Sequence, residues 1–289
     1  MTYIKCETSD GFVVIDIEGA AVATGVLRVA RKLLVDGAWN LARSATYSAA
    51  SFGLEVSGAS AGVNVDGEGR DAAVATVVAE LAARTGSPTL ALDAGKGCTP
   101  NELTELTVRD PRSPARFDDG LLAIGIVAAA EAALGSLEGT TVAIEPGLSV
   151  DLLDQKFRSR GASMVEMTDG LISACDVLCI GSRPALIDHD LASALRAKVI
   201  VPAGPLPVTA RGLAVARREG VMVLPDFVSL AAPMVVGFAG STTTDVGERI
   251  AAVITEVADH PEGHFLGACE RAESFLDSWA NVPFGRPLP

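Results

Sequence analysis

The stretch from residue 41 to residue 66 reads LARSATYSAASFGLEVSGASAGVNVD. Its first half continues an alanine-rich segment that starts at Gly37, and Gly53 stands where such a helix would end, so a helix is expected over residues 37–53. Its second half, SGASAG, consists of small, uncharged residues. The stretch therefore predicts a helix followed by a glycine-rich segment, with Ser48 in the first part and Ser60 in the second.

The composition limits what this chain can bind. Of its 289 residues, 49% are hydrophobic, which is enough to bury a full core in one large or two medium domains. The net charge of −13 opposes nucleic acid and anionic membrane surfaces, which proteins bind through Lys and Arg. There is no apolar run long enough for a membrane span and no signal-peptide pattern, and the five cysteines are scattered. We therefore expect a cytoplasmic protein with reduced thiols and no metal site that acts on a small molecule.

Short apolar segments alternate with helix-like segments along most of the chain. Strands are expected over residues 11–19 and 87–95, and helices over 71–86 and 119–136. Five further apolar strands, separated mostly by helices, are expected over residues 140–147, 162–169, 175–182, 197–204 and 220–227. This alternation predicts an α/β protein whose second domain is a Rossmann-like, doubly wound parallel sheet. The expected boundaries are an N-terminal α/β domain over 1–117, the Rossmann-like domain over 118–240, and C-terminal helices over 241–289 that pack across the cleft.

Four segments, in this order along the chain, resemble the amino-acid dehydrogenases that act on glutamate, leucine, phenylalanine and valine, with leucine dehydrogenase as the nearest shape. They are LARSATYSAASFGLEVSGASAGV, LEGTTVAIEPG, CDVLCIGSRPALID and AKVIVPAGPLPVTARGLAVARREGVMVLPDFVSLAA. The resemblance implies a first domain that binds substrate and assembles a homo-oligomer, and a second domain that binds a dinucleotide. It also implies oxidative deamination of an amino acid with NAD or NADP.

The resemblance implies an active site that this sequence has altered. The family uses one lysine for the substrate carboxylate and a second lysine to activate water and the imine, and the matching positions hold Ser48 and Ser60. A serine hydroxyl supplies neither the charge nor a general acid–base group near neutral pH. Asp93 matches the family's catalytic aspartate, although it could equally form the turn at a strand end. Gly25 and Arg28 match the family's G-G-T-R turn.

Other residues offer partial replacements for the lost groups. Lys96, in the loop after Asp93, would return an ammonium group to the cleft, or it is a solvated lysine in a glycine-rich loop. Arg116 and Asp118 lie near a threonine position of the family, and Arg116 would replace a lost charge. The predicted catalytic residues are Asp93, Lys96 and Ser60, and the predicted substrate-binding residues are Ser48, Arg28 and Asp118.

The dinucleotide fingerprint in this sequence is degenerate. The turn after the expected strand reads EPGLSVD, in which Gly147 is the only glycine and Pro146 has no N–H for a phosphate. Asp169 falls where an acid would bind the adenosine ribose and favour NAD over NADP, or it is an ordinary turn residue. The predicted cofactor contacts are Gly147, Ser149, Asp169, Gly181 and Ser182.

Three functions remain open on these observations, and we favour the first. The first is an NAD(P)-dependent oxidoreductase whose substrate is an amine, an imine or a modified amino acid. The second is a non-catalytic relative that acts as a binding or regulatory subunit. A third reading, an enzyme that binds a nucleotide-like ligand without redox chemistry, shares features of both. Loss of two lysines and most of the glycine fingerprint fits either a rebuilt site or a site that no longer catalyses.

Overall fold

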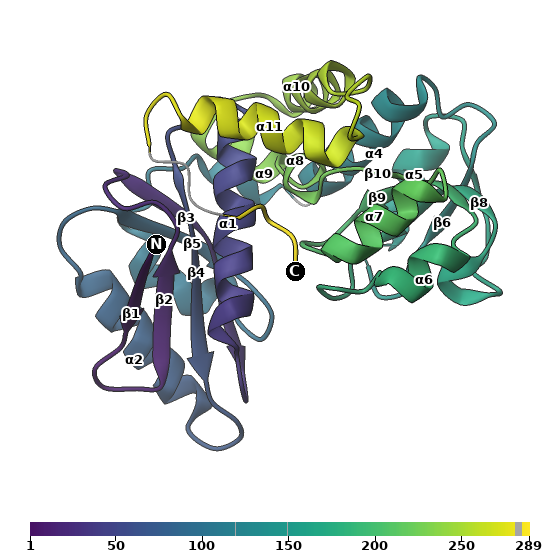
Figure 1. Cartoon of the computed structure of the whole chain (residues 1–289). Coiled ribbons are helices and arrows are strands. Elements are labelled where there is room, and N and C mark those ends of the chain that lie inside the picture. Colours follow the sequence, from purple (N-terminus) through teal and green to yellow (C-terminus); the bar gives the residue numbers. More distant parts are fainter. Residues whose placement is uncertain (119, 149, 281–284) are drawn as a thin grey trace. The chain divides into compact units, whose positions relative to one another are not determined.

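The computed structural model describes residues 1–118, 120–148, 150–280 and 285–289 (Figure 1). The chain forms two compact units, which are described separately. Unit 1 contains Met1–Arg112 and Glu273–Pro287, and unit 2 contains Ser113–Ala272 and Leu288–Pro289. The chain thus first passes from unit 1 to unit 2 between Arg112 and Ser113.

Unit 1 is built on a mixed five-stranded sheet with the strand order β1-β2-β4-β3-β5. β2 pairs in antiparallel with β1 and β4, whereas β3 pairs in parallel with β4 and β5. The strands are β1 (Thr2–Lys5), β2 (Gly11–Ile15), β3 (Val22–Ala30), β4 (Ser57–Asn64) and β5 (Thr89–Ala94).

Each face of this sheet packs against a helix. One face forms the main apolar core with α2 (Arg70–Ala83), through alternate strand residues such as Leu27, Ala59 and Leu92. The other face packs against α1 (Val35–Ser51), and Gly58 lets the helix come close, because a Cβ there would lie 1.7 Å from the Ala42 carbonyl oxygen. After β5 the chain forms η1 (Pro100–Leu103) and α3 (Thr104–Thr107).

Unit 2 is built on a parallel five-stranded sheet with the strand order β10-β9-β8-β6-β7. β6 comes first in the chain, β7 pairs on one side of it and β8 on the other, so the winding reverses between β6 and β8. This confirms the predicted parallel, doubly wound sheet, in which ligands bind at the carboxyl ends of the two strands that flank the reversal. The strands are β6 (Thr141–Ile144), β7 (Ser163–Met164), β8 (Cys175–Ile180), β9 (Ala197–Pro202) and β10 (Met222–Val223).

Three helices of unit 2 begin at side chains that cap them. Asp188 accepts a hydrogen bond from the Leu191 N–H, and Thr209 and Thr242 cap two other helices in the same way. The helical segments are η2 (Pro114–Phe117), α4 (Leu121–Leu134), α5 (Val150–Arg158), η3 (Gly170–Ile172), α6 (His189–Ala194), α7 (Ala210–Arg218), α8 (Asp226–Ser229), α9 (Ala232–Ala239), α10 (Thr243–Glu256) and α11 (His264–Leu276). The last turn of α11, from Glu273 onward, belongs to unit 1.

Two segments of unit 1, the one that resembles the family's G-G-T-R turn and the glycine-rich SGASAG segment, are strands. Gly25 and Arg28 lie inside β3, and the SGASAG segment lies inside β4, where every residue from Ser57 to Val63 is buried. Small residues suit β4 because neighbouring groups fill the space above them: a Cβ at Gly62 would meet the Phe12 ring at 2.7 Å. The glycines here make room for packing rather than for a turn.

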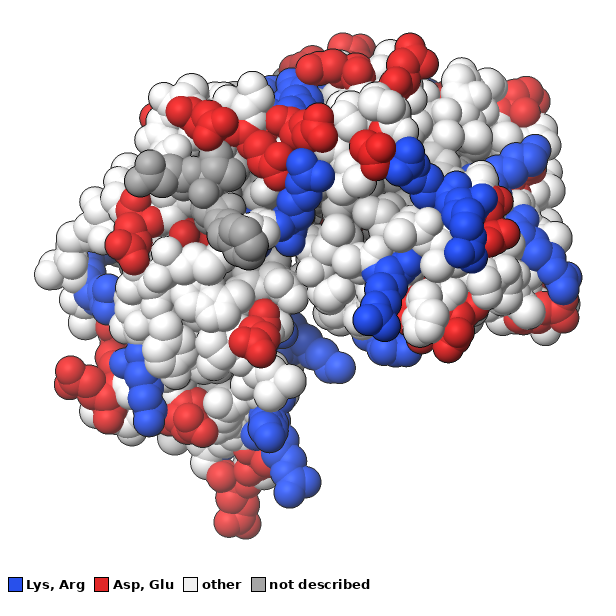
Figure 2. Space-filling view, viewed as in Figure 1, with Lys and Arg blue, Asp and Glu red and all other residues white. Residues whose placement is uncertain are grey.

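The surface carries charges of both signs. Acidic and basic side chains are interspersed on the face shown in Figure 2. Within the described residues, no helix has both the length and the apolar character needed to cross a membrane.

Candidate functional site

Polar residues gather on one face of the unit 1 sheet. On β3, Ala23, Leu27 and Val29 enter the core beside α2, so the alternate residues Thr24 and Arg28 lie on the opposite face. The same face carries Ser60 of β4 and Asp93 of β5, because both pair in register with Val26. The sheet therefore brings together three of the predicted site residues, Arg28, Ser60 and Asp93.

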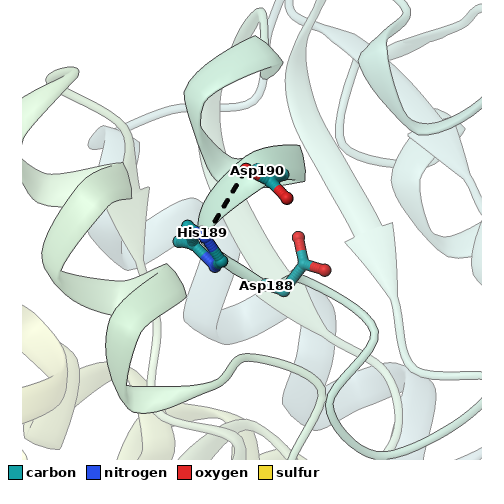
Figure 3. Close-up of side chains that lie close together, drawn as sticks. All are labelled: Asp188, His189 and Asp190. Atoms are coloured by element: carbon teal, nitrogen blue, oxygen red, sulfur yellow. Dashed lines mark ion pairs between the residues drawn. The ribbon is translucent and has the colours of Figure 1, made fainter.

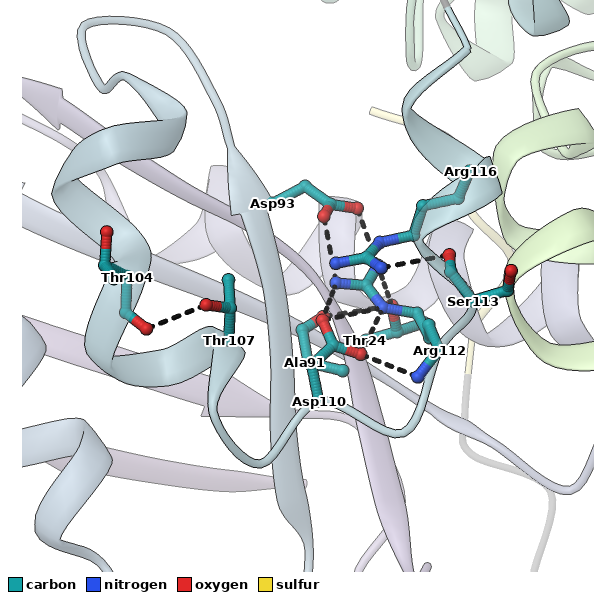
Figure 4. Close-up of polar contacts among 9 residues, drawn as sticks. All are labelled: Thr24, Ala91, Asp93, Thr104, Thr107, Asp110, Arg112, Ser113 and Arg116. Carbon is teal, nitrogen blue, oxygen red and sulfur yellow. Dashed lines mark hydrogen bonds and ion pairs between the residues drawn. The ribbon is translucent and has the colours of Figure 1, made fainter.

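Asp93 is held by an arginine that the sequence analysis did not single out. Arg112 Nη1 donates to Asp93 Oδ2 at 2.6 Å, and Arg112 Nη2 donates to Oδ1 at 2.9 Å (Figure 4). The Asp93 side chain is 33% exposed, whereas the Arg112 side chain is 2% exposed. A proton shuttle needs a carboxylate that faces the reacting atoms. In this structure both oxygens of Asp93 face a buried guanidinium instead.

Arg112 is the centre of a larger buried network. It also donates through Nε and Nη2 to Asp110, whose side chain is 4% exposed, and through Nη1 to Thr24 Oγ1 at 3.2 Å. Burial alone would lower the pKa of Arg112, but its hydrogen bonds to Asp110 and the charge of Asp93 together raise that pKa. The sequence DPRSP places Asp110 beside Arg112, which was the available signal for this network.

Arg28 lies on the same face but has a different environment. Its Nε and Nη2 atoms are buried, and no group in the described part of the chain accepts a hydrogen bond from them. Burial lowers the pKa of its guanidinium. Gly95 leaves room for the side chain, since a Cβ there would lie 2.9 Å from Arg28 Cγ. Arg28 is therefore a half-buried cation whose Nε and Nη2 atoms are enclosed and make no hydrogen bond with the described residues.

The three remaining predicted residues of unit 1 differ in accessibility. Ser60 is 0% exposed, and its hydroxyl has no hydrogen-bonding partner among the described residues. Ser48, on α1, is 8% exposed. Lys96 is exposed in the loop after β5, and its backbone carbonyl accepts from the Val29 N–H at 2.9 Å. The loop is thus tied to the end of β3, while the lysine side chain lies in solvent.

Asp118 and Arg116 belong to unit 2, beside η2. Asp118 Oδ1 accepts from the Gly120 N–H at 2.8 Å, so this carboxylate supports the start of α4. Arg116 is 5% exposed, donates to the Ser113 carbonyl at 3.1 Å and lies 4.0 Å from the centre of the Phe117 ring. Asp118 thus has a local structural role at the start of α4.

A glutamate occupies the edge of the unit 2 sheet where the winding reverses. Glu145 follows β6 directly and is 8% exposed. Its Oε2 accepts from the Gly181 N–H at 2.8 Å and from the Ser182 N–H at 3.0 Å, and its Oε1 accepts from the Ser182 hydroxyl. Glu145 therefore bridges the carboxyl ends of β6 and β8. Glu145 is the first residue of the EPGLSVD segment in the sequence. Its partners could not be predicted from that segment, because they lie 36 and 37 residues further along the chain.

No protein-family model and no curated protein matches the sequence. Solved structures, however, match the fold over most of the chain. L-tryptophan dehydrogenase from Nostoc punctiforme shares 18% identity over 96% of both chains with a TM-score of 0.69. A hetero-hexameric glutamate dehydrogenase from Thermus thermophilus, in a Leu-bound form, shares 17% identity over 94% of this chain and 86% of that chain with a TM-score of 0.75.

The chain has the amino-acid dehydrogenase fold. Glutamate dehydrogenase from Peptoniphilus asaccharolyticus agrees, with 15% identity over 93% of this chain and 86% of that chain and a TM-score of 0.64. The resemblance expected from the four sequence segments is therefore confirmed at the level of fold. Identities this low establish the fold alone, so the activity has to be argued from the residues of the site.

The unit 2 edge of this dehydrogenase fold carries an acid that opposes a dinucleotide diphosphate. Such a group binds to backbone N–H groups at the start of the helix that follows the first strand, beside the carboxyl ends of the strands. The N–H groups of Gly181 and Ser182 already donate to Glu145, whose negative charge would also repel a phosphate. Pro146 has no N–H to offer.

The other predicted cofactor contacts give little support to a diphosphate. Gly147 adopts a positive φ of 90° with open space around it. Asp169 is exposed, and its nearest cation is Arg196 at 3.6 Å, so an acid is accessible where a ribose would lie. Ser149 lies outside the described residues.

One group of potential metal ligands occurs among the described residues, at the start of α6. The carboxylates of Asp188 and Asp190 and the His189 ring lie within 4.8 Å of one another, and all three residues are exposed (Figure 3). Asp188 caps α6, and His189 Nε2 lies 3.5 Å from Asp190 Oδ1. Helix capping and an ordinary surface pair explain this group without a metal.

Proposed function

We propose that this chain binds a small molecule as a non-catalytic, regulatory protein with the amino-acid dehydrogenase fold. The observation that carries the proposal is Glu145. Its carboxylate accepts the N–H groups of Gly181 and Ser182, and it places a negative charge at the strand ends where a dinucleotide diphosphate would bind. A protein that keeps this glutamate has no evident use for NAD or NADP.

The unit 1 site supports the same proposal. Amino-acid oxidation needs a proton shuttle and cations for the substrate carboxylate. Asp93 is engaged by Arg112 through both carboxylate oxygens, and serines stand at the two lysine positions of the family. The groups that catalysis requires are therefore either replaced or occupied from within the protein.

The comparisons favour a role in an assembly. One protein of this fold is a hetero-hexameric glutamate dehydrogenase in a Leu-bound form, so unlike subunits occur together in one assembly of this fold. We propose that the present chain also assembles, either with copies of itself or with a related subunit. In this role its ligand would act as an effector rather than as a substrate.

A second candidate is the NAD(P)-dependent oxidoreductase with an altered substrate, an amine, an imine or a modified amino acid. Two observations favour it. The Asp93 side chain remains 33% exposed, so a substrate can reach it, and Asp169 is exposed where it could meet the adenosine ribose. This candidate requires Glu145 to leave Gly181 and Ser182 before a dinucleotide binds.

A turnover assay separates the two candidates. The purified chain is incubated with NAD or NADP and the twenty L-amino acids, and with NADH or NADPH and a panel of keto acids with ammonia, imines and amines, while the absorbance of the reduced nicotinamide is followed. The proposal predicts no turnover above that of a control without protein. Turnover that is lost in Asp93→Asn would overturn the proposal in favour of the oxidoreductase.

A further inference from the structure

We infer that Arg28 binds the carboxylate of a small ligand through the Nε and Nη2 edge of its guanidinium. The inference rests on the binding function proposed above and names its ligand class. It starts from the buried, unpartnered state of those two nitrogens in the described part of the chain. Enclosing the donors of a cation without hydrogen-bonding partners costs folding free energy. A protein that keeps such donors is therefore expected to bind a partner with them.

The geometry of the unused edge specifies the partner. The Nε–H and Nη2–H bonds of a guanidinium point the same way, and together they hold one carboxylate through two parallel hydrogen bonds. Lys cannot reproduce this fork, because its ammonium is a point charge. Arg28 thus offers a two-point site for a planar anion.

In two buried arginines of unit 1, Arg43 and Arg112, the Nε–Nη2 edge of the guanidinium binds a carboxylate. Arg43 donates through Nε to Asp16 Oδ2 at 2.8 Å and through Nη2 to Oδ1 at 2.8 Å. Arg112 donates through Nε to Asp110 Oδ1 at 3.0 Å and through Nη2 to Oδ2 at 2.7 Å. In both cases the same edge holds a carboxylate of the protein. Among the described residues no carboxylate binds this edge of Arg28, and we assign that role to a ligand.

The two glycines beside Arg28 bring no acid to it. Arg28 pairs in register with Gly62, and Gly95 lies beside its side chain, so neither neighbour offers a carboxylate. The nearest acid on this face of the sheet, Asp93, is bonded to Arg112. Ser60, two register positions from Gly62 on β4, adds an unpartnered hydroxyl that would bind a polar group of the same ligand.

Because Nε and Nη2 are closed to solvent, the covering residues have to open before a ligand enters. We therefore expect slow entry and a preference for small carboxylates. Sodium acetate, L-leucine and L-glutamate are suitable probes, with inorganic phosphate as the competing anion.

The first test follows the Arg28 side chain directly. The full chain is labelled with ¹⁵N-arginine, and the Arg28 Nε–H signal is identified by its loss in Arg28→Lys. A saturable shift of this signal with at least one of the three carboxylates, and not with phosphate, is expected. Arg31, whose side chain is 86% exposed, is the matched control, and its signal should not move. No shift with any carboxylate, or a shift with phosphate alone, would overturn the inference.

Thermal unfolding gives a second, independent measurement, because it also tests the protein without a ligand. Arg28→Met removes the unpaired charge, so it should raise the unfolding temperature of the free protein by a few degrees and abolish the further rise that a carboxylate causes. Arg31→Met should change neither. A lower unfolding temperature for free Arg28→Met would mean that the protein itself satisfies the guanidinium, which contradicts the inference.

The inference and the proposed function fail in different experiments. Turnover, or binding of a dinucleotide, would overturn the proposed function. It would not change the response of the Arg28 signal to carboxylates. Absence of a carboxylate response would overturn the inference and leave the dinucleotide result unchanged.

Discussion

Replacing Glu145 by alanine removes the carboxylate that joins the ends of β6 and β8. Three hydrogen bonds are lost, from the Gly181 N–H, the Ser182 N–H and the Ser182 hydroxyl. A hydrogen bond to a charged group contributes about 1.5–3 kcal/mol, but water replaces the carboxylate wherever it has access. Ser182 is exposed, so its two bonds count little, and Gly181 is only partly covered.

The expected loss for Glu145→Ala is therefore about 2 kcal/mol, close to the contribution of one such bond. For 289 residues, with an unfolding entropy of about 2.1 cal/mol/K per residue, that loss corresponds to a fall of about 3 °C in the unfolding temperature. Glu145→Gln keeps an acceptor without the charge, so about half of the effect is expected. Urea unfolding and differential scanning calorimetry measure both values.

The matched control is Glu248→Gln, because Glu248 is an exposed acid of unit 2 on α10. It should change the free energy of unfolding by less than about 0.5 kcal/mol. If Glu145→Ala is as mild as this control, the carboxylate does not hold the two strand ends together. The reasoning that it occupies the dinucleotide edge would then be refuted.

Three further changes test other parts of the structure. Arg112→Met leaves two carboxylates without their cation and should cost about 3–5 kcal/mol in urea unfolding, a value that a loss under 1 kcal/mol would contradict. Gly58→Ala places a Cβ 1.7 Å from a carbonyl oxygen of α1, so the loss in free energy of unfolding should be about 3 kcal/mol or more, the upper end of the range for overpacking. Gly37→Ala is the control, because a Cβ there meets open space, and it should be neutral or stabilising. Calorimetry measures both variants. Hydrogen bonding from Lys198 lowers the pKa of Asp176 to about 2, so its stabilisation is complete above the unfolded pKa of about 4 and is lost as the pH falls toward 2. Asp176→Asn should lose less stability over that acid range in pH-dependent unfolding, and equal slopes for both proteins would refute the assignment.

The strands of unit 2 were predictable because their sequence pattern is strong. Parallel strands buried on both faces read as continuous apolar runs, and β8 and β9 follow this pattern. The expected strands at β7 and β10 shrink to two residues each, since only Ser163–Met164 and Met222–Val223 pair with a neighbour. In unit 1 the small residues of β4 concealed a strand, because their propensity favours loops while their burial favours the sheet.

The site was only partly predictable for a different reason. Alternation along the strands places Arg28, Ser60 and Asp93 on one face, and the resemblance had already singled out these residues. The partners that decide their chemistry are distant in the chain: Arg112 lies 19 residues from Asp93. Burial has the same property, since nothing in the local sequence indicates that the Ser60 hydroxyl is fully enclosed.

Calorimetric titration of the purified protein with NAD, NADH, NADP and NADPH tests whether the chain binds a dinucleotide. Because Glu145 holds the donors of Gly181 and Ser182, we predict no measurable heat of binding for any of the four. Binding of one of them in the micromolar range would contradict the account, because the glutamate would then have to leave the strand ends for a diphosphate.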